Sequence, residues 1–412
     1  MDRSVNGPRG LPGTPPRTAE VVVIGGGVSG ASTAFQLAKR GLRDVVLLER
    51  RRLGAGATGK SGALVRAHYA NVPESRLTLE SLRLFRAWDE EVGAGSCGFE
   101  ATGFVQVVGP EDEAKLRANV AAQQAIGIET SVVSAAELRE IEPLMRTDDL
   151  TYAAFEPNSG YADPNGTVYG FAAAAAARGA TICTDTEATA ILVSGDRVVG
   201  VETSAGRIAT GTVVLAGGAW SDRLLLPLGL DFGLTPERAQ VVIFRWPPEI
   251  DQRRRHRVVI DATRSSWFRP EGINSTLIGV EMGDRRTEPD GFQETPDTDQ
   301  IDGARTALAA RFPAFAGATI RGGWAGMIMV SPDSHPIIDQ IPGIPGLFVM
   351  TGDSGTSFKT SPAIGICLAE WITEGVPKLV DLAPFRSTRF SEGRPWQDEH
   401  SYKKDSLLTI SR

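Results

Sequence analysis

Three glycines near the N-terminus have the spacing of a turn that binds a dinucleotide. Gly25, Gly27 and Gly30 follow the apolar run Val21 to Ile24 and open a stretch with helical periodicity that extends to about Arg40. In this G-x-G-x-x-G pattern the first glycine makes the tight turn, the second lets the backbone approach a pyrophosphate, and the third lets helix and strand pack closely. The N-terminus of the helix would then offer its unpaired N–H groups to the phosphates.

An acidic residue ends the next apolar run. Glu49 follows Val45 to Leu48, at the place where a dinucleotide-binding unit carries the carboxylate that accepts hydrogen bonds from a ribose. Strand, helix and acid arrive in register within about 30 residues, as a βαβ unit requires. We therefore interpret residues 21–49 as a dinucleotide-binding unit and not as an ordinary glycine-rich turn.

Three further glycine-rich stretches have the same character. Residues 53–62 are too glycine-rich for a helix, residues 213–221 read as a buried strand that runs into a Gly-Gly turn, and residues 347–359 repeat that pattern before a helix that opens at Ser361-Pro362. Backbone without side chains usually lies against something flat or charged. For residues 53–62 a flexible surface loop is the alternative.

Composition limits the class of protein. The 412 residues carry a formal charge of −7, which argues against a nucleic-acid surface. Cys97, Cys183 and Cys367 have neither metal nor redox spacing, and no metal site is predicted. No apolar run reaches the length of a membrane helix. Residues 1–18 are rich in Pro, Gly and Arg and resemble a loose tail without a signal-peptide h-region, so we expect a cytoplasmic protein without an integral membrane segment.

The periodicity of the remaining chain predicts alternating helices and strands. The predicted helices cover residues 75–88, 111–126, 164–177, 301–312 and 361–372. The predicted strands cover residues 104–108, 180–193, 197–203, 240–246, 258–260, 267–269 and 276–280. The acidic residues 288–299 are expected to form an exposed loop.

Taken together, these motifs resemble the family of FAD-dependent amine and amino-acid oxidoreductases that includes D-amino-acid oxidase, glycine oxidase and the sarcosine oxidases. The resemblance is distributed over roughly residues 20–390. Besides the glycine fingerprint, it is carried by the stretch Gly54 to Arg66, Leu215 to Ser221 (Leu-Ala-Gly-Gly-Ala-Trp-Ser), Trp324 to Gly326, Pro332 to Ile338 and the turn Gly352 to Gly355.

The resemblance implies an α/β fold with two interleaved domains. A Rossmann-like FAD-binding domain would comprise residues 19–90, 151–225 and 325–412. An α+β substrate-binding domain, built on a mostly antiparallel sheet, would comprise residues 91–150 and 226–324. The change of sequence texture near residues 91, 151 and 226 agrees with this division.

The resemblance also assigns roles to single residues. By position in the motif, Arg66 and Lys359 match the pair that holds the substrate carboxylate in sarcosine oxidases, and a bidentate arginine with a lysine would orient the adjacent α-carbon. Tyr69, Trp267 and Glu281 fall near the pocket. Glu281 is unexpected there, because a carboxylate beside a bound amine favours the unreactive cation; a solvated acid at a strand end is the alternative. We interpret His335 as structural. His68 follows Arg66 closely and could reach the pocket, but a lone histidine is more often structural than catalytic.

Further residues are candidates for binding FAD by their position in the family motifs. They are Gly25, Gly27, Val28, Ser29, Gly30, Glu49, Arg50, Ala57, Thr58, Gly59, Ser61, Gly62, Ala63, Leu64, Ala188, Ala216, Gly217, Trp220, Gly326, Asp353, Ser354, Gly355, Thr356 and Lys359.

Departures from the family pattern bear on the cofactor and its reoxidation. Gly326 stands where monomeric sarcosine oxidases carry the flavin-linking cysteine, and Lys60 stands where dimethylglycine dehydrogenases carry the flavin-linking histidine. We therefore expect non-covalent FAD. Leu277 lies near the place of the lysine that activates oxygen in monomeric sarcosine oxidase, which leaves oxidase and dehydrogenase both open, with O2 or an electron carrier as acceptor.

The predicted function is oxidation of the C–N bond of an amino acid or N-alkyl amino acid, by hydride transfer from the α-carbon to flavin N5 and hydrolysis of the imine. Two alternatives remain. One is an FAD-dependent 2-hydroxy-acid dehydrogenase, because a carboxylate clamp suits either substrate. The other is a low-turnover flavoprotein that serves as an assembly or interaction partner. The sequence makes no prediction of oligomeric state.

Overall fold

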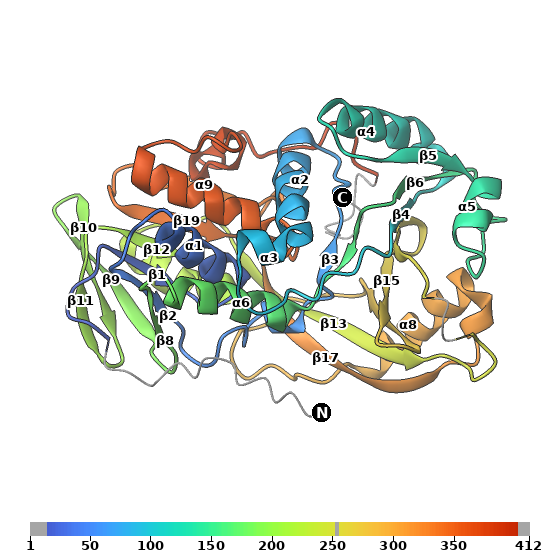
Figure 1. Cartoon of the computed structure of the whole chain (residues 1–412), viewed down its shortest axis with the longest axis horizontal. Coiled ribbons are helices and arrows are strands. Elements are labelled where there is room, and N and C mark those ends of the chain that lie inside the picture. The colour runs from blue at the N-terminus through green and yellow to red at the C-terminus, as the bar shows by residue number, and fades with distance from the viewer. Residues whose placement is uncertain (1–14, 252–254, 403–412) are drawn as a thin grey trace.

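The fold is built on two large sheets that lie side by side (Figure 1). The computed structural model describes residues 15–251 and 255–402. A loose tail was predicted for residues 1–18, and residues 1–14 of it lie outside the described residues. At Thr18 the chain already forms a bridge with Ala209, so the predicted tail extends too far.

The first sheet has six strands and contains the dinucleotide-binding unit. Its order is β18 (Ile337–Gln340), β19 (Leu347–Thr351), β12 (Val213–Leu215), β1 (Val21–Ile24), β2 (Val45–Leu48) and β8 (Thr181–Cys183). All neighbours pair in parallel except β18, which is antiparallel to β19. The carboxyl ends of the parallel strands therefore meet at one edge, where open α/β sheets bind ligands.

Alternate side chains of this sheet enter two different cores. Val21 and Val23 of β1 pack under the helices α1 (Val28–Lys39), α6 (Pro164–Ala176) and α9 (Ser361–Glu374), whereas Val22 and Ile24 face the opposite layer. Burial on both faces explains why these strands are continuous apolar runs. Helices α2 (Val72–Arg86) and α3 (Trp88–Glu91) extend the helical layer beside α9.

The opposite layer is a three-stranded antiparallel sheet of β9 (Ala188–Ser194), β10 (Arg197–Thr203) and β11 (Gly206–Ala209), with the short helix α7 (Asp222–Leu225) beside it. The predicted single strand over residues 180–193 is wrong. The chain turns at Asp185, which has a φ of 52°, because β8 and β9 belong to different layers and a straight strand cannot join them.

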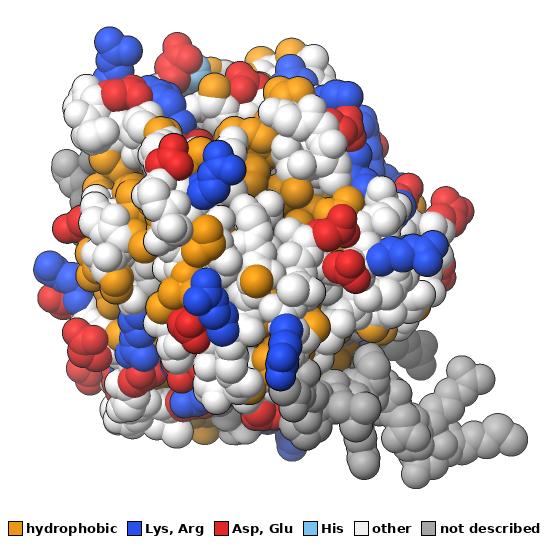
Figure 2. Space-filling view, turned by 90° about the vertical axis from the view of Figure 1, so that its left-hand side faces the viewer, with side chains coloured by type: hydrophobic (Ala, Val, Ile, Leu, Met, Phe, Trp, Pro, Cys, Tyr) orange, Lys and Arg blue, Asp and Glu red, His pale blue; other side chains and the backbone are white. Residues whose placement is uncertain are grey.

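On the side of the molecule seen in Figure 2, acidic and basic side chains are interspersed with apolar ones.

The second sheet has eight strands and is mostly antiparallel. Its order is β17 (Thr319–Val330), β13 (Thr235–Arg245), β16 (Ser275–Val280), β15 (Ser266–Glu271), β14 (Val258–Asp261), β4 (Phe104–Val107), β6 (Tyr152–Glu156) and β5 (Ser131–Ser134). The exception is the parallel pair of β14 and β4. Helices α4 (Glu113–Ala125), α5 (Ala135–Ile141) and α8 (Thr298–Arg311) pack on this sheet.

The two sheets confirm the predicted α/β fold class. The division into domains stays a prediction, and two strands bear on its boundaries. Strand β6 pairs with β4 and β5 although its residues fall in the range expected for the FAD-binding domain, and β17 runs past residue 325. A small sheet of β3 (Leu64–Val65) and β7 (Gly160–Tyr161) lies between the large sheets.

Candidate active site

A cavity of about 650 Å³ lies where the edge of the first sheet meets the second sheet. The loops that follow β1, β12 and β19 line one side, and residues of β13, β15, β16 and β17 line the other. A pocket of this size, lined by apolar side chains and a few converging polar groups, is typical of a cofactor or substrate site.

The glycine fingerprint leaves room for a ligand at the N-terminus of α1. A Cβ on Gly25 would lie 2.2 Å from the Ala216 carbonyl oxygen, and one on Gly30 would lie 1.9 Å from the Gly25 carbonyl oxygen, so both positions require glycine for packing. Gly27 is the N-cap and supplies no side chain that would cap the helix. The Val28 N–H donates to the Thr58 hydroxyl at 3.1 Å. Because Gly27 adds no side chain, the positive end of the helix dipole still faces the cavity, which suits a pyrophosphate.

Glu49 closes the other end of this binding loop. Its carboxylate accepts hydrogen bonds from the N–H groups of Gly26 and Arg51, each at 2.8 Å. These contacts fix the carboxylate at the end of β2, on the cavity wall, where the remaining lone pairs can accept hydrogen bonds from a diol. The arrangement fits the ribose role predicted for Glu49.

The second glycine turn places another helix N-terminus at the cavity. Gly352 and Gly355 have φ values of 62° and 79°, and helix α9 starts after Thr360 without a side-chain cap. Thr351 lines the cavity, and its buried hydroxyl oxygen has no hydrogen-bond partner among the described residues. A buried polar atom of this kind calls for a partner from a ligand, so the turn fits a cofactor with a polar edge.

Two buried cations lie together beside this turn. Arg66 and Lys359 are 2% and 6% exposed and both line the cavity. Burial, and then the charge of Arg66, lower the pKa of Lys359 well below its ordinary value. Burial also lowers the pKa of Arg66. Because both shifts reflect the cost of charge without solvent, an anion that reaches this corner gains strongly from binding there.

Tyr69 supports the two cations from behind. The Arg66 guanidinium carbon and the Lys359 ammonium nitrogen each lie 4.8 Å from the centre of its ring. The Tyr69 hydroxyl donates to the Thr356 carbonyl oxygen at 3.3 Å, and Lys359 donates to the same oxygen at 3.1 Å. Tyr69 therefore holds both cations in place, although it does not line the cavity itself.

The opposite wall carries Trp267 and Glu281, as the sequence predicted. The indole of Trp267 occupies the space over two glycines, because a Cβ on either Gly62 or Gly279 would lie 2.3 Å from it. Gly326 and Lys60 face each other on the wall, with the Lys60 Cβ 3.0 Å from the position of a Cβ on Gly326. Leu277 is fully buried and is not part of the wall.

Most of the predicted site residues line the cavity, and four do not. Those on the wall are Gly25, Gly27, Val28, Ser29, Glu49, Arg50, Ala57, Thr58, Ser61, Gly62, Ala63, Leu64, Arg66, Ala188, Ala216, Gly217, Trp220, Trp267, Glu281, Gly326, Asp353, Gly355, Thr356 and Lys359. Gly30, Gly59, Ser354 and Tyr69 lie behind it. The Gly59 N–H donates to the Gly54 carbonyl oxygen, and the N–H of the buried Ser354 donates to the Met329 carbonyl oxygen. These two residues therefore shape the loops but do not line the cavity.

Several residues of the wall were not predicted from the sequence. They include Lys60 (named only for its place in the flavin-linking pattern), Gln240, Arg285, Asp290, Phe292, Glu294, Met327, Met329 and Thr351. The acidic residues 288–299 are mostly exposed, as predicted, but the loop also borders the cavity. Asp290 accepts hydrogen bonds from Trp220 and Arg223 at 2.8 and 2.6 Å, and Glu294 pairs with Lys60 at 3.0 Å. Acidic composition alone carries no signal for these partners.

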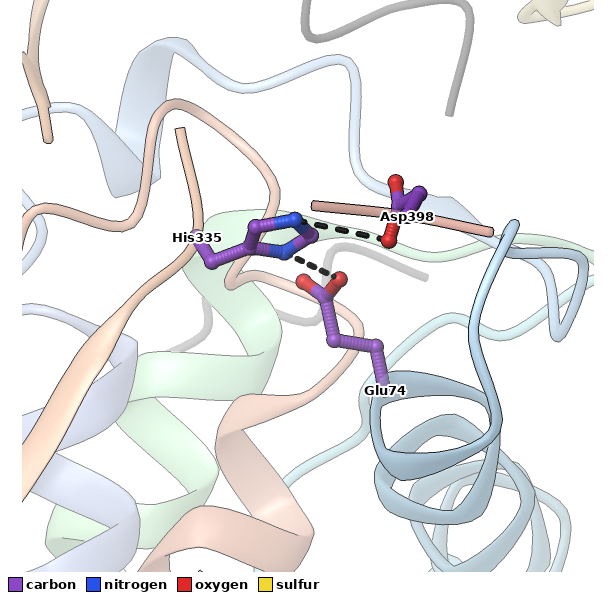
Figure 3. A group of neighbouring side chains, drawn as sticks. All are labelled: Glu74, His335 and Asp398. Atoms are coloured by element: carbon purple, nitrogen blue, oxygen red, sulfur yellow. Dashed lines mark hydrogen bonds and ion pairs between the residues drawn. The ribbon is translucent and has the colours of Figure 1, made fainter. Parts of the chain in front are cut away.

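His335 takes part in a cluster outside the cavity. Its Nδ1 lies 2.9 Å from Glu74 and its Nε2 lies 3.4 Å from Asp398, as Figure 3 shows. The three side chains could supply ligand atoms to an ion. However, the imidazole directs a different nitrogen to each carboxylate, and Asn71 donates to both carboxylates. The contacts tie α2 to the C-terminal segment, which agrees with the structural role predicted for His335.

His68 is also held in a structural contact. Burial lowers its pKa to about 3, so the ring is neutral at ordinary pH, and its Nε2 lies 2.6 Å from the Tyr402 hydroxyl. The ring stacks on Tyr402 behind Arg66.

In the described part of the chain, no helix combines the length and the apolar character needed to cross a membrane.

Comparisons with known proteins identify the family of this chain. The family model for FAD dependent oxidoreductases (DAO) matches residues 20–371. Mitochondrial dimethylglycine dehydrogenase from Mus musculus is 27% identical over 409 residues, which cover 93% of this chain and 47% of that protein. Sarcosine oxidase subunit beta from Arthrobacter sp is 27% identical, with 94% of each chain covered. The crystal structure of L-proline dehydrogenase from P. horikoshii is 28% identical with a TM-score of 0.84, covering 92% of this chain and 100% of that chain.

This chain spans about half the length of the mitochondrial relative that it matches. The family match extends over most of the chain, and the two glycine turns, Glu49 and the unpartnered Thr351 hydroxyl fit the cofactor that this family uses. The chain is therefore an FAD-dependent oxidoreductase of the DAO family, and FAD is its cofactor.

Proposed function

We propose that this protein oxidises the C–N bond of an amino acid or N-alkyl amino acid. The observation that carries the proposal is the pair of buried cations, Arg66 and Lys359, at one corner of the cavity. A guanidinium fork and an ammonium together match a carboxylate. The similarity to a dimethylglycine dehydrogenase, a sarcosine oxidase subunit and an L-proline dehydrogenase supports an amino acid as the substrate.

Positioning supplies most of the catalysis in this proposal. When bound, FAD accepts a hydride from the carbon next to the amine, and the resulting imine is hydrolysed by water. Arg66 and Lys359 hold the carboxylate so that the α-carbon keeps one orientation, with Tyr69 fixing both cations from behind. The neutral amine is the reactive form, and no base from the protein is required.

The chain would hold FAD without a covalent bond. The fingerprint at Gly25 to Gly30 and Glu49 would bind the pyrophosphate and ribose, and the N-terminus of α9 with the backbone of residues 352–355 would stabilise negative charge at the pyrimidine edge of the flavin. Gly326 and Lys60 stand at the two positions where family members attach the flavin, and neither side chain offers a thiol or an imidazole. The final electron acceptor is O2 or an electron carrier.

The proposal is tested by anaerobic reduction of the flavin. Purified holoprotein is mixed with glycine and with N-methyl, cyclic, D- and L-amino acids, and the loss of flavin absorbance is followed. We expect at least one amino acid to bleach the flavin, the Arg66→Met variant to lose this reaction, and a matched Arg197→Met variant at an exposed site to retain it. Bleaching by 2-hydroxy acids alone would replace the proposal with the hydroxy-acid dehydrogenase. Bleaching by neither class would favour a low-turnover flavoprotein.

A further inference from the structure

The C-terminal segment, residues 394–402, connects the two large sheets. At one end the Trp396 N–H donates to the Asp333 carboxylate at 2.8 Å, in the loop that precedes β18 of the first sheet. At the other end Asn119 of α4 donates to the His400 carbonyl oxygen at 3.1 Å. Since α4 packs on the second sheet, this short segment holds elements of both sheets together.

Tyr402 is buried at the end of this segment. The residue is 2% exposed and belongs to an apolar cluster. The other buried members of the cluster are Val108, Leu116, Val120 and Ala154. The Tyr402 hydroxyl lies 2.6 Å from His68 Nε2, and the two rings stack at an interplanar angle of 13° with their centres 5.8 Å apart. A buried tyrosine whose hydroxyl has a partner holds the chain firmly, because apolar burial and the hydrogen bond act together.

The contact between Tyr402 and His68 keeps the same form across the physiological pH range. Burial raises the pKa of Tyr402 and lowers the pKa of His68 to about 3, so both groups are neutral. A neutral imidazole carries one N–H and one acceptor nitrogen, and either of them can pair with a hydroxyl. The contact is therefore constant over the range in which binding is measured.

His68 stands two residues after Arg66, in a stretch of backbone after β3 that forms neither helix nor strand. Between them, the Ala67 N–H donates to Glu156 at 2.9 Å. Both side chains also meet one ring, because the centre of Phe104 lies 6.4 Å from the centre of the His68 ring and 5.6 Å from the Arg66 guanidinium carbon. Backbone outside the regular elements keeps its conformation through such contacts, so a shift of His68 is passed to Arg66.

We propose that Tyr402 is a positioning residue for the carboxylate of the substrate. Through His68 it holds Arg66 in the orientation in which the guanidinium makes two parallel hydrogen bonds to the carboxylate. The described residues of the C-terminal segment do not line the cavity, so the segment acts on the site from behind. The substrate site is complete only when this segment is docked. The inference rests on the proposed binding of a carboxylate by Arg66.

The test removes the Tyr402 hydroxyl and measures the carboxylate site directly. Tyr402→Phe keeps the buried ring and loses only the hydrogen bond to His68. In the holoprotein we expect Kd for unreactive carboxylates to rise by about 2- to 10-fold, the range of one neutral hydrogen bond. The probes are acetate, benzoate and pyrrole-2-carboxylate, and binding is followed by the change in flavin absorbance. Hydrogen exchange of the backbone amides of residues 66–69 should become faster.

The matched control is Tyr152→Phe. Tyr152 lies on β6 and packs against the same apolar cluster, where its ring centre is 4.3 Å from the Arg117 guanidinium carbon. This variant should keep the Kd and the exchange rates of the unchanged protein. The FAD content per chain separates a loss of fold from a loss of positioning, because a misplaced Arg66 changes the Kd at full FAD content.

Variants of His68 test whether Tyr402 acts through this residue. In a His68→Leu background the hydrogen bond is already absent, so Tyr402→Phe should have no further effect on Kd. His68→Leu by itself should raise Kd by about 2- to 10-fold. His68→Gln should retain most of the affinity, because its amide keeps a polar group near the position of Nε2. The comparison of these two variants decides the question if Tyr402→Phe does not retain FAD.

The outcomes separate this inference from the proposed function. If Kd in Tyr402→Phe equals that in Tyr152→Phe, or rises equally with and without His68, Tyr402 does not position Arg66, and the carboxylate site itself stands. Equal affinities in His68→Leu and His68→Gln would likewise overturn the inference. If no carboxylate binds to the unchanged protein, the proposed site at Arg66 and this inference are both wrong.

Discussion

Arg66 and Lys359 lie against the same aromatic ring, each with its charged group 4.8 Å from the centre of Tyr69. Arg66 follows β3, and Lys359 lies in the turn between β19 and α9. Two like charges that are buried side by side raise the free energy of the folded protein unless an anion joins them. The carboxylate site that we propose depends on this relationship, which leads to the first two predictions.

Replacement of Arg66 by lysine should weaken carboxylate binding although the charge is kept. The guanidinium can make two parallel hydrogen bonds to a carboxylate, and an ammonium lacks this fork. We expect the loss of about 1.5–3 kcal/mol, or about 10- to 100-fold in affinity for an unreactive carboxylate, measured by the change in flavin absorbance on titration. Arg197→Lys, at an exposed site, serves as the control. Equal affinities in the two variants would show that Arg66 does not contact the carboxylate.

The affinity for a carboxylate should depend on pH through Lys359. Burial and the neighbouring Arg66 lower the pKa of Lys359 well below its ordinary value. The protonated amine binds the anion, so affinity is complete below this lowered pKa and is lost as pH rises through it, by up to about tenfold per pH unit. Titration of a carboxylate ligand across pH should show this decline in the unchanged protein. The decline should be absent in Lys359→Met; a decline that persists there would assign the pH dependence to another group.

FAD should leave the protein on acid denaturation. Gly326 and Lys60 stand at the two positions where family members attach the flavin covalently. The two residues lie next to each other on the cavity wall. Precipitation with acid should therefore release the yellow colour into the supernatant, where the absorbance spectrum identifies free FAD. Colour that remains in the washed pellet would contradict non-covalent binding.

The loop that connects β16 to α8, residues 281–297, should slow the release of FAD. Asp290 bonds to Trp220 and Arg223, and also to Arg50 at 3.3 Å, next to Glu49. These donors lower the pKa of Asp290 to about 2, so its charge persists throughout the physiological range. Each exposed ion pair contributes about 0.2–1 kcal/mol, and Asp290→Asn should accelerate FAD release by up to about fivefold.

Release of FAD can be followed by the rise of flavin fluorescence after dilution. The control is Asp284→Asn, which changes the same charge in the same loop but does not line the cavity. Equal release rates for the two variants would exclude Asp290 as a contact that closes the loop over the cofactor. Raising the salt concentration should reduce the difference between them, because the ion pairs are partly exposed.

Gly30→Ala should destabilise the cofactor-binding unit. The added Cβ would lie 1.9 Å from the Gly25 carbonyl oxygen, so α1 would have to move away from the turn. Overpacking of this kind costs about 1–3 kcal/mol, and we expect a lower Tm and a reduced FAD content per chain. Gly211→Ala is the control, because no atom lies within 4 Å of a Cβ at that position. An unchanged Tm in Gly30→Ala would show that the helix shifts without cost.

The sequence by itself determined the dinucleotide-binding unit. The chemistry of that unit depends on backbone conformation and on residues close together in the chain, so that Gly25, Gly27, Gly30 and Glu49 specify turn, helix and carboxylate locally. The same holds for the turn at residues 352–355 and for the apolar runs of the first sheet, which are buried on both faces. The pairing of Arg66 with Lys359 was reached through resemblance to a family and not through the spacing of these residues.

Only the tertiary structure decided what forms the opposite wall of the cavity. Strands β13 and β17 carry cavity-lining residues such as Gln240 and Met327, and alternation along a strand does not reveal which face meets a cavity. The partners of Asp290 were equally hidden, because Arg50 follows β2 and Arg223 lies in α7, and both reach Asp290 only in the folded chain. A charged residue carries no mark of its partner in the sequence, since the attraction depends on distance in space.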